Sequence, residues 1–334
     1  MNKIFNVALV GCGTIAPNHL KALLALENVK IVALCDKNVE KAEKRKDEYS
    51  LDARVYDDFL TMLDNENLDS VHIATPHYLH CEMTLEALKR NINVFLEKPA
   101  CISNEELEAM KLAEQSSEAK LCVCFQNRFN PSTVIAERIA QEDGGVRSAF
   151  GSVFWYRGEK YYTESGWRGS YATEGGGVMI NQAIHTIDLL CHFLGKPESV
   201  IATKANHHLK GIIEVEDSCE GIISFDNGKR ANFYATTSFE GRDATILYLV
   251  TEKRRAIQIQ YSNVYVDGKR IDDPTLVADY VGKECYGNGH NYLIAKYYEA
   301  LADGKEVPVT LESAQYALKI LLAAYNSSDE ETKI

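Results

Sequence analysis

Short apolar runs alternate with amphipathic segments through the first 125 residues of the chain. The apolar runs have the length of buried strands and lie at residues 5–10, 29–35, 70–74, 94–96 and 120–125. Patterns with helical spacing occupy the intervals, at residues 18–26, 39–49, 57–63, 82–90 and from Asn104 onward. Because strand and helix alternate regularly, we predict an α/β domain over residues 1–125 with the doubly wound parallel sheet of the Rossmann fold.

The pattern changes after residue 125, where a second domain is expected over residues 126–334. Residues 131–141 and 180–194 have helical spacing, residues 149–157 alternate as a strand, and residues 161–174 form an irregular aromatic loop. Short strands follow at 200–206, 220–225, 230–237, 244–250, 256–261 and 264–266, then helices at 290–301 and 311–325 and a polar tail at 327–334. This order predicts an α+β domain with a large, mainly antiparallel open-faced sheet. Residues 222–225 are apolar on both faces, so the open face is expected to pair with another subunit in a homodimer or homotetramer.

Composition narrows the class of protein. The formal net charge of −12 argues against binding to nucleic acid or to an anionic membrane surface. The sequence has no long uncharged apolar run, and it enters the first strand without the features of a signal peptide. The nine cysteines are an odd number scattered among apolar residues, which is typical of reduced thiols in a cytoplasmic protein.

A dinucleotide fingerprint follows the first strand. Gly11, Gly13 and Ala16 form the G-x-G-x-x-A pattern between a strand and a helix, and Thr14 and Ile15 are expected to contact the cofactor from the same loop. Asp36 ends the next strand, where a carboxylate accepts hydrogen bonds from a ribose and repels a 2′-phosphate. NAD is therefore favoured, although the neighbouring Lys37 leaves NADP possible.

Two more strand exits are expected at the same edge of the sheet. Glu97 and Lys98 precede Pro99, which places Lys98 just beyond the carboxyl end of a strand, where ligands bind in such sheets. Thr75 and Pro76 follow another strand, with His80 expected to line the nicotinamide side of the site. His77 is expected to be exposed. Neither the His77-x-x-His80-Cys81 cluster nor Cys122-Val123-Cys124 has convincing zinc-ligand spacing, so no metal site is predicted.

The helix after the triple glycine at residues 175–177 carries a polar stripe of Asn181, His185 and Asp188 beside an apolar seam. The glycines permit close approach of a ligand, which favours a functional face over a buried structural histidine. Asp188 would either orient the His185 imidazole or cap a neighbouring group. The aromatic loop before the helix supplies candidate pocket walls in Tyr161, Tyr162, Trp167 and Arg168, and Arg168 could hold a carboxylate or phosphate or form a structural salt bridge.

Together these motifs resemble the glucose–fructose oxidoreductase / inositol dehydrogenase / MocA (Gfo/Idh/MocA) family, nearly from end to end. The matching positions are Gly11 and Gly13, Thr75-Pro76 with His80, Glu97-Lys98-Pro99, Asn127-Arg128, Gly176-Gly177 with His185 and Asp188, and Gly289-His290. The resemblance implies catalytic roles for Lys98 and His185. Many members have aspartate at the position of Asn181 and glycine at that of Ala183, and an asparagine cannot take a proton.

The hypothesis is reversible hydride transfer between a nicotinamide and a secondary carbinol or ketone of a sugar, sugar derivative or polyol. His185 would act as general base, Lys98 would stabilise the developing alkoxide, and Asn181 would position the hydroxyl. Substrate contacts are expected from Lys98, Arg128, Tyr161, Trp167, Arg168, Asn181 and His185. Lys98 and His185 must then converge on one nicotinamide ring. The alternatives are a non-catalytic dinucleotide sensor, a reductase of keto-sugars or other carbonyls and, less favoured, a redox-dependent glycoside hydrolase.

Overall fold

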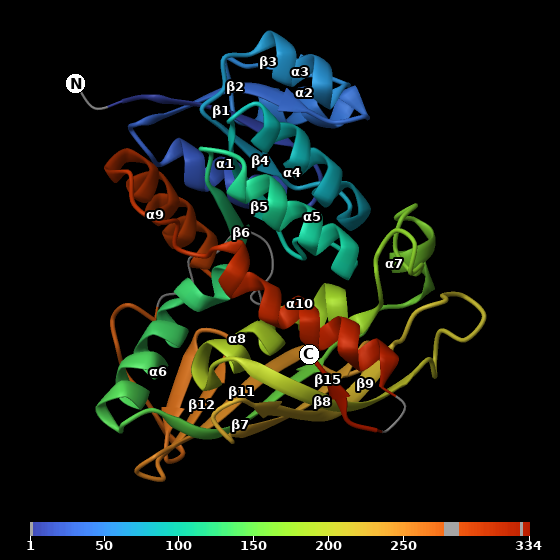
Figure 1. Ribbon diagram of the computed structural model, residues 1–334, viewed down its shortest axis with the longest axis vertical. Coiled ribbons are helices and arrows are strands. Elements are labelled where there is room, and N and C mark those ends of the chain that lie inside the picture. The colour runs from blue at the N-terminus through green and yellow to red at the C-terminus, as the bar shows by residue number, and fades with distance from the viewer. Residues whose placement is uncertain (1–2, 277–286, 328–329) are drawn as a thin grey trace. The chain divides into compact units, whose positions relative to one another are not determined.

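A computed structural model describes residues 3–276, 287–327 and 330–334 of the chain, which forms two compact units (Figure 1). The first unit comprises residues 1–126 and 290–314, and the second comprises residues 127–289 and 315–334. The first crossing between the units follows the boundary expected at residue 125, but residues 290–314 return to the first unit. A single cut therefore does not separate the units, because helix α9 (Gly289–Asp303) lies almost wholly in the first.

The first unit contains a parallel sheet with the strand order β3-β2-β1-β4-β5-β6. Its strands are β1 (Phe5–Val10), β2 (Val29–Cys35), β3 (Arg54–Tyr56), β4 (Ser70–Ile73), β5 (Asn93–Glu97) and β6 (Leu121–Cys124). The helices between them are α1 (Ala16–Leu24), α2 (Val39–Glu48), α3 (Phe59–Asn65), α4 (His80–Lys89) and α5 (Asn104–Gln115). The doubly wound fold is therefore confirmed, with the order reversing between β1 and β4, where ligands bind in such sheets.

The expected strands of this unit are correct to within a few residues, and β3 was missed. The central strands are continuous buried runs, such as Val71, Val94 and Leu96, which is why hydrophobicity alone revealed them. Strand β3 is short, lies at the sheet edge and contains the exposed Arg54, so no apolar run marks it. Edge position thus removes the signal by which the other strands were found.

The second unit contains a nine-stranded sheet with the order β14-β13-β12-β11-β7-β10-β9-β8-β15. All its neighbouring strands are antiparallel except β7 and β10, so the mainly antiparallel sheet is confirmed. The strands are β7 (Val146–Phe154), β8 (Pro197–Ala205), β9 (Ser218–Phe225), β10 (Arg230–Thr236), β11 (Ala244–Thr251), β12 (Ala256–Gln260), β13 (Asn263–Val266), β14 (Lys269–Arg270) and β15 (Thr332–Lys333). Strand β7 begins three residues earlier than expected, and β15 pairs with β8 where a polar tail was expected.

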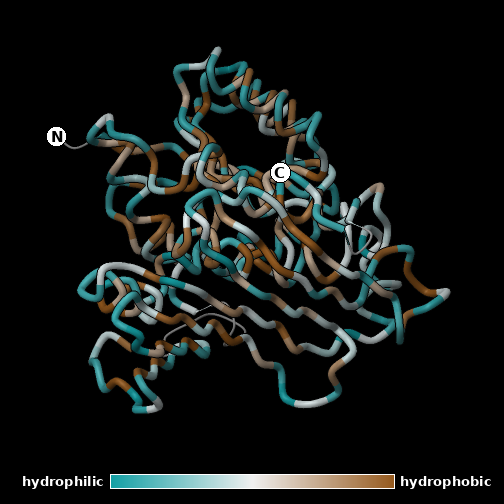
Figure 2. The backbone as a smooth tube through the Cα atoms, turned by 60° about the horizontal axis from the view of Figure 1, so that its bottom comes forward, coloured by the Kyte–Doolittle hydropathy of each residue, from teal (hydrophilic) through white to brown (hydrophobic). Residues whose placement is uncertain are grey.

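Helices α6 (Pro131–Glu142) and α8 (Ile184–Leu194) cover one face of this sheet, α8 against β7 and β10 and α6 against β12 and β13 (Figure 1). Helix α10 (Leu311–Asn326) contributes residues 315–326 to this unit, and a short helix, α7 (Glu159–Thr163), lies within the loop expected to be irregular. The strands carry mixed hydropathy along their length, as a sheet with one covered face requires (Figure 2).

The other face of the sheet carries a continuous row of partly exposed side chains. Cross-strand pairing places Ile201 beside Ile222, Ile222 beside Asn232, Asn232 beside Phe150, and Phe150 beside Tyr248. Four of these are apolar or aromatic and between 38% and 40% exposed. The eight cysteines that the structure describes are free and buried, while Cys285 lies outside the described residues. Among the described helices, none is long and apolar enough to cross a membrane.

Candidate active site

The glycine loop of the first unit lies between β1 and α1. Gly11 has φ +89°, and a Cβ there would overlap the carbonyl group of Ala74, where the chain leaves β4. At Gly13 a Cβ would meet no atom within 4 Å, so the backbone faces open space. Arg45 holds the loop from the side by donating to the Gly13 carbonyl at 3.1 Å. The loop therefore has the tight turn and the open backbone that a pyrophosphate requires.

Asp36 reaches back to this loop from the end of β2. Its Oδ2 accepts the Cys12 N–H at 2.8 Å and its Oδ1 accepts the Asn38 N–H at 2.9 Å. Each carboxylate oxygen retains a lone pair, which a ribose hydroxyl can use. Thr14 is exposed at the start of α1, and Ile15 is its N-cap residue, with no acidic side chain in the first turn. These residues fit an NAD molecule with its ribose at Asp36 and its phosphates at the helix N-terminus.

The exits of β4 and β5 occupy the same edge of the sheet, as expected. Thr75 and Pro76 follow β4, and Lys98 follows β5 as a half-buried residue joined to Pro99 by a cis peptide bond. His80 does not line this edge, because its ring is buried and its nitrogens lie 2.7 Å from the Pro99 carbonyl and 2.9 Å from the Thr75 carbonyl. It joins the two exits to each other instead, and burial lowers its pKa. His77 is also buried, so its expected exposure was wrong.

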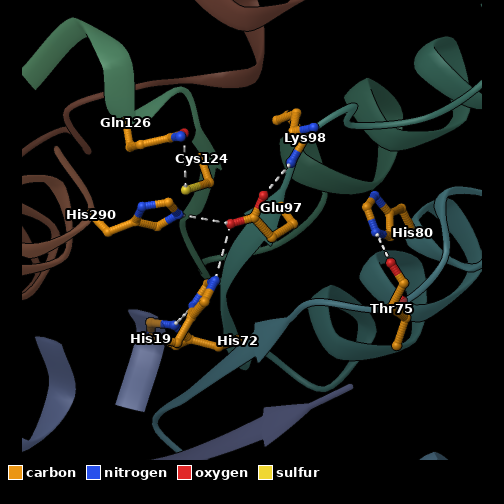
Figure 3. A network of polar contacts seen from close by, with 9 residues as sticks. All are labelled: His19, His72, Thr75, His80, Glu97, Lys98, Cys124, Gln126 and His290. Atoms are coloured by element: carbon orange, nitrogen blue, oxygen red, sulfur yellow. Dashed lines mark hydrogen bonds and ion pairs between the residues drawn. The ribbon is translucent and has the colours of Figure 1, made fainter. Parts of the chain in front are cut away.

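Behind Lys98, Glu97 is the centre of a buried polar network (Figure 3). His19 Nε2 lies 3.0 Å and His290 Nε2 lies 3.3 Å from the same carboxylate oxygen. An ionised carboxylate only accepts, so both nitrogens carry protons. Although burial opposes the charged form, these hydrogen bonds hold the pKa of Glu97 well below its usual range. The Glu97 side chain, expected among the cofactor contacts, is thus engaged inside the unit.

The network continues away from Glu97 through imidazole rings. His19 Nδ1 lies 2.9 Å from His72 Nδ1, and His72 Nε2 lies 2.9 Å from the Tyr298 hydroxyl. Burial lowers the pKa values of His72 and His290, so both are neutral near pH 7. His19, Glu97 and His290 also form the one group of metal-ligand type found among the described residues. Their separations of 3.0 and 3.3 Å are those of the N–H···O hydrogen bonds just described.

In the second unit, Asn181 lies in a π-helical turn (Met179–Ala183) that precedes α8. The extra residue in this turn changes the regular i, i+4 alignment that was expected for Asn181 and His185. The Asn181 amide nitrogen lies 2.5 Å from Oε1 of Glu174 and 3.3 Å from the Tyr161 hydroxyl. Burial raises the pKa of Glu174, which has no exposed surface, to about 7.

The triple glycine serves internal packing, which corrects the expectation that a ligand approaches there. A Cβ on Gly176 would overlap the Tyr325 hydroxyl, and one on Gly177 would overlap the Glu216 carbonyl. The buried Glu216 carboxylate accepts the N–H groups of Gly177 at 3.0 Å and of Met179 at 3.1 Å. It therefore caps the beginning of the helical segment, where an anion is favourable.

Asp188, the last member of the expected polar stripe, pairs with Arg128. The guanidinium donates to both carboxylate oxygens, at 2.9 and 2.6 Å, and the two side chains are 10% and 1% exposed. This bidentate geometry resolves the alternatives for Asp188, because both of its oxygens face an arginine. The Arg128 guanidinium, which was expected to contact the substrate, is therefore engaged in a structural ion pair.

His185 lines a cavity that lies wholly in the second unit. The walls of this cavity include Trp155, Gln182, Thr245 and Tyr261. Three buried polar atoms on these walls have no hydrogen-bond partner among the described residues: Trp155 Nε1, Gln182 Oε1 and Thr245 Oγ1. Buried polar atoms are normally paired, so a ligand with hydroxyl groups fits this wall.

Within each unit, the structure groups some of the residues expected for the site. The cofactor residues meet at the carboxyl edge of the parallel sheet. In the second unit, hydrogen-bond and cation–π contacts link Asn181, Tyr161, Arg168 and Trp167 in that order. Lys98 belongs to the first unit and His185 to the second, so their convergence stays a prediction.

Some residues of the second unit were missed by the sequence analysis. They are Glu174, Gln182, Trp155 and Thr245. Only Glu174 offered a signal, as an acidic residue directly before the glycines. The other three become candidates only because the fold places them on the walls of one cavity.

Each of the two units matches a known protein family. Residues 5–125 match the family model described as an oxidoreductase family with an NAD-binding Rossmann fold, and residues 135–257 match the GFO/IDH/MocA C-terminal domain. Inositol 2-dehydrogenase of Rhizobium meliloti is 26% identical over 98% of this chain and 97% of its own. D-glucoside 3-dehydrogenase of Escherichia coli is 28% identical over 66% of this chain and 67% of its own. The WlbA dehydrogenase of Bordetella pertussis, solved with NADH and UDP-GlcNAcA, superposes with a TM-score of 0.85 at 25% identity over 99% of both chains.

Proposed function

This chain belongs to the Gfo/Idh/MocA family of oxidoreductases with an NAD-binding Rossmann fold, and we propose that it oxidises or reduces a secondary carbinol or ketone of a sugar or polyol. The observation that carries the substrate class is the cavity at His185, whose walls hold unpaired polar atoms suited to hydroxyl groups. Relatives named as inositol and glucoside dehydrogenases support the same class.

NAD, when bound, supplies the group that accepts or returns a hydride. The residues that would hold it are Gly11, Gly13, Thr14, Ile15, Asp36, Thr75 and Pro76, with Lys98 at the nicotinamide end. The open backbone at Gly13 and the lone pairs of Asp36 support this assignment. Asp36 favours NAD over NADP, because its charge repels a 2′-phosphate.

The chain's own side chains would manage the proton and the charge on oxygen. His185 takes the hydroxyl proton, a general-base role that imidazole side chains commonly perform. The Lys98 ammonium stabilises the negative charge that develops on the same oxygen. Asn181 directs its amide nitrogen at Glu174, so it offers its carbonyl oxygen to a hydroxyl proton. The proposal requires that Lys98 and His185 act on the same reacting carbon.

The test is turnover by Lys98→Met and His185→Ala across a panel of sugars and polyols, in both directions. Each variant is expected to lose at least about 100-fold in kcat, because proton transfer and charge stabilisation are each worth that much. Lys89→Met and His192→Ala, on α4 and α8, are matched controls that should keep wild-type rates. NAD binding, measured by fluorescence, must survive in every variant.

The outcomes separate the alternatives. Normal turnover by both variants would end the catalytic assignment. Tight NAD binding with no turnover of any panel member would favour the dinucleotide sensor, and activity only with ketones would favour the carbonyl reductase.

The oligomeric proposal rests on the open face of the nine-stranded sheet. Its row of Ile201, Ile222, Phe150 and Tyr248 would bury its apolar surface against the same row of a second copy. A homodimer, or a homotetramer built from it, is the expected assembly. Free buried cysteines support a reducing, cytoplasmic location.

A further inference from the structure

Aromatic rings and guanidinium groups alternate along one side of the second unit. Arg157 lies 4.7 Å from the ring centre of Trp155 and 5.5 Å from that of Tyr161. Arg168 lies between the next pair of rings, 4.4 Å from the ring centre of Tyr161 and 4.6 Å from that of Trp167. Each cation is thus held between aromatic rings, which restricts its side-chain freedom.

The two arginines differ in their polar partners. Arg157 Nη1 lies 3.3 Å from the Asp243 carboxylate and donates to the Tyr156 carbonyl at 2.5 Å. The guanidinium of Arg168 has no carboxylate at ion-pair distance and no hydrogen bond among the described residues, and its Nε is buried. A buried N–H without an acceptor costs about 1–3 kcal/mol, so Arg168 is suited to a ligand that supplies one.

Tyr161 places Arg168 next to the turn that carries Asn181. The Tyr161 hydroxyl lies 3.3 Å from the Asn181 amide nitrogen and 3.1 Å from that of Gln182. Asn181 is the proposed hydroxyl-positioning residue, and Gln182 lines the cavity at His185. Only the Tyr161 ring therefore separates Arg168 from the two residues of this turn that would bind a substrate.

We propose that Arg168 binds an anionic group of the substrate, so that the physiological substrate is a sugar derivative bearing a carboxylate or a phosphate. This inference rests on the proposed function and specifies its substrate class. A planar guanidinium matches both anions through paired N–H···O bonds, and such charge-assisted bonds are the stronger kind. The chain as a whole carries a net charge of −12, which repels anions, so a local cation with no carboxylate at ion-pair distance determines where an anion binds.

The test compares three forms of one sugar that the enzyme turns over: the neutral sugar, its uronate and its phosphate ester. Arg168→Gln should raise KM for the anionic forms by about 10- to 100-fold, the effect of losing a charged hydrogen-bond pair. The increase in KM should be at least about tenfold larger for the anionic forms than for the neutral form of the same sugar. Arg168→Lys keeps the positive charge but loses the paired N–H donors, so its KM values for the anionic forms should lie between those of wild type and Arg168→Gln. Arg147→Gln, an exposed arginine of β7, is the matched control.

The natural anion is identified as the one, uronate or phosphate ester, whose KM increases more in Arg168→Gln. Equal losses for all three forms, or no preference of the wild type for either anion, would overturn the proposal. Calorimetric binding of the uronate and the phosphate ester to the NAD-loaded protein separates the two hypotheses. Arginine-dependent binding without turnover would contradict the proposed reaction and support the anion site. Turnover without a preference for anions would support the proposed reaction and contradict the anion site.

Discussion

The amide nitrogen of Asn181 lies 2.5 Å from a carboxylate oxygen of Glu174, a side chain with no exposed surface. The other Glu174 oxygen accepts the Gly169 N–H at 2.6 Å. An ionised carboxylate can only accept, so it holds the Asn181 amide with its nitrogen inward and its carbonyl oxygen turned away. A protonated Glu174 could instead donate, which would favour the reversed amide. The orientation of the Asn181 amide therefore depends on the ionisation of its neighbour.

Glu174 should make alcohol oxidation depend on pH. Burial raises its pKa to about 7, while Arg168 opposes and Glu216 adds to this rise, and the Tyr161 and Tyr162 rings pack nearby. As pH increases through 7, Glu174 ionises, Asn181 presents its acceptor, and kcat should rise. We expect Glu174→Gln to remove this ionisation from the pH–rate profile and to lower kcat by about tenfold, the scale of one positioning hydrogen bond.

The control for this experiment is the exposed Glu164, whose change to Gln should leave the profile intact. Urea denaturation at each pH separates a loss of folding from a loss of orientation. An unaltered profile in a folded Glu174→Gln protein would contradict the role of Glu174.

Glu216 should make stability fall with rising pH. Burial raises its pKa to about 7, above the unfolded value, so the folded state binds the proton more tightly. The stabilisation is complete below the unfolded pKa of about 4.3 and is lost as pH rises through 7, by about 4 kcal/mol in total. We expect urea denaturation to show that Glu216→Gln lacks this component, so that wild type loses stability relative to the variant between pH 5 and pH 8. A pH-independent difference would contradict this assignment.

The Glu97 network should be sensitive to loss of one imidazole donor. His290→Ala removes a hydrogen bond to a buried carboxylate, which should cost about 3 kcal/mol of unfolding free energy. The exposed His208→Ala is a matched control and should change stability by less than about 0.5 kcal/mol. Chelator treatment should leave the wild-type Tm unchanged, because hydrogen bonds hold the cluster. A Tm decrease on chelation would show that a metal ion binds there.

Asp36 should determine the choice of dinucleotide. Asp36→Asn removes the charge but keeps an oxygen that can accept the Cys12 N–H. We expect the ratio of the Kd for NADP to the Kd for NAD to fall by at least about tenfold, because repulsion of the 2′-phosphate disappears. Asp52→Asn, at an exposed site of the same unit, should leave the ratio unchanged. Tighter binding of NADP than NAD by wild type would reverse our interpretation of Asp36.

The open sheet face should mediate assembly. Ile222→Glu introduces a charge into the centre of the apolar row and should convert the dimer to a monomer in light scattering, without loss of circular dichroism. Leu112→Glu places the same charge on an exposed site of α5 and should leave the mass unchanged. A monomeric wild type, or a dimeric Ile222→Glu, would contradict the sheet interface.

Much of the fold and the cofactor half of the site were predictable because their signals are local. The buried runs of β1, β4 and β5, the turn at Gly11 and the proline after Lys98 are each specified by adjacent residues. Strand β3 and the end strand β15 carry no such run, and the π-turn at Asn181 interrupts a periodicity that otherwise indicates an ordinary helix.

The sequence by itself determined the Rossmann sheet, the family resemblance and the presence of Lys98, Asn181 and His185. Only the tertiary structure decided what surrounds them. Glu97 meets His290 across 193 positions of the chain, and Glu174 engages Asn181 only because the backbone turns at Gly175. Arg128 pairs with Asp188 rather than pointing to an open site. Hydrophobic periodicity specifies elements, but the partner of a buried charge depends on which elements pack together, and that information is not local.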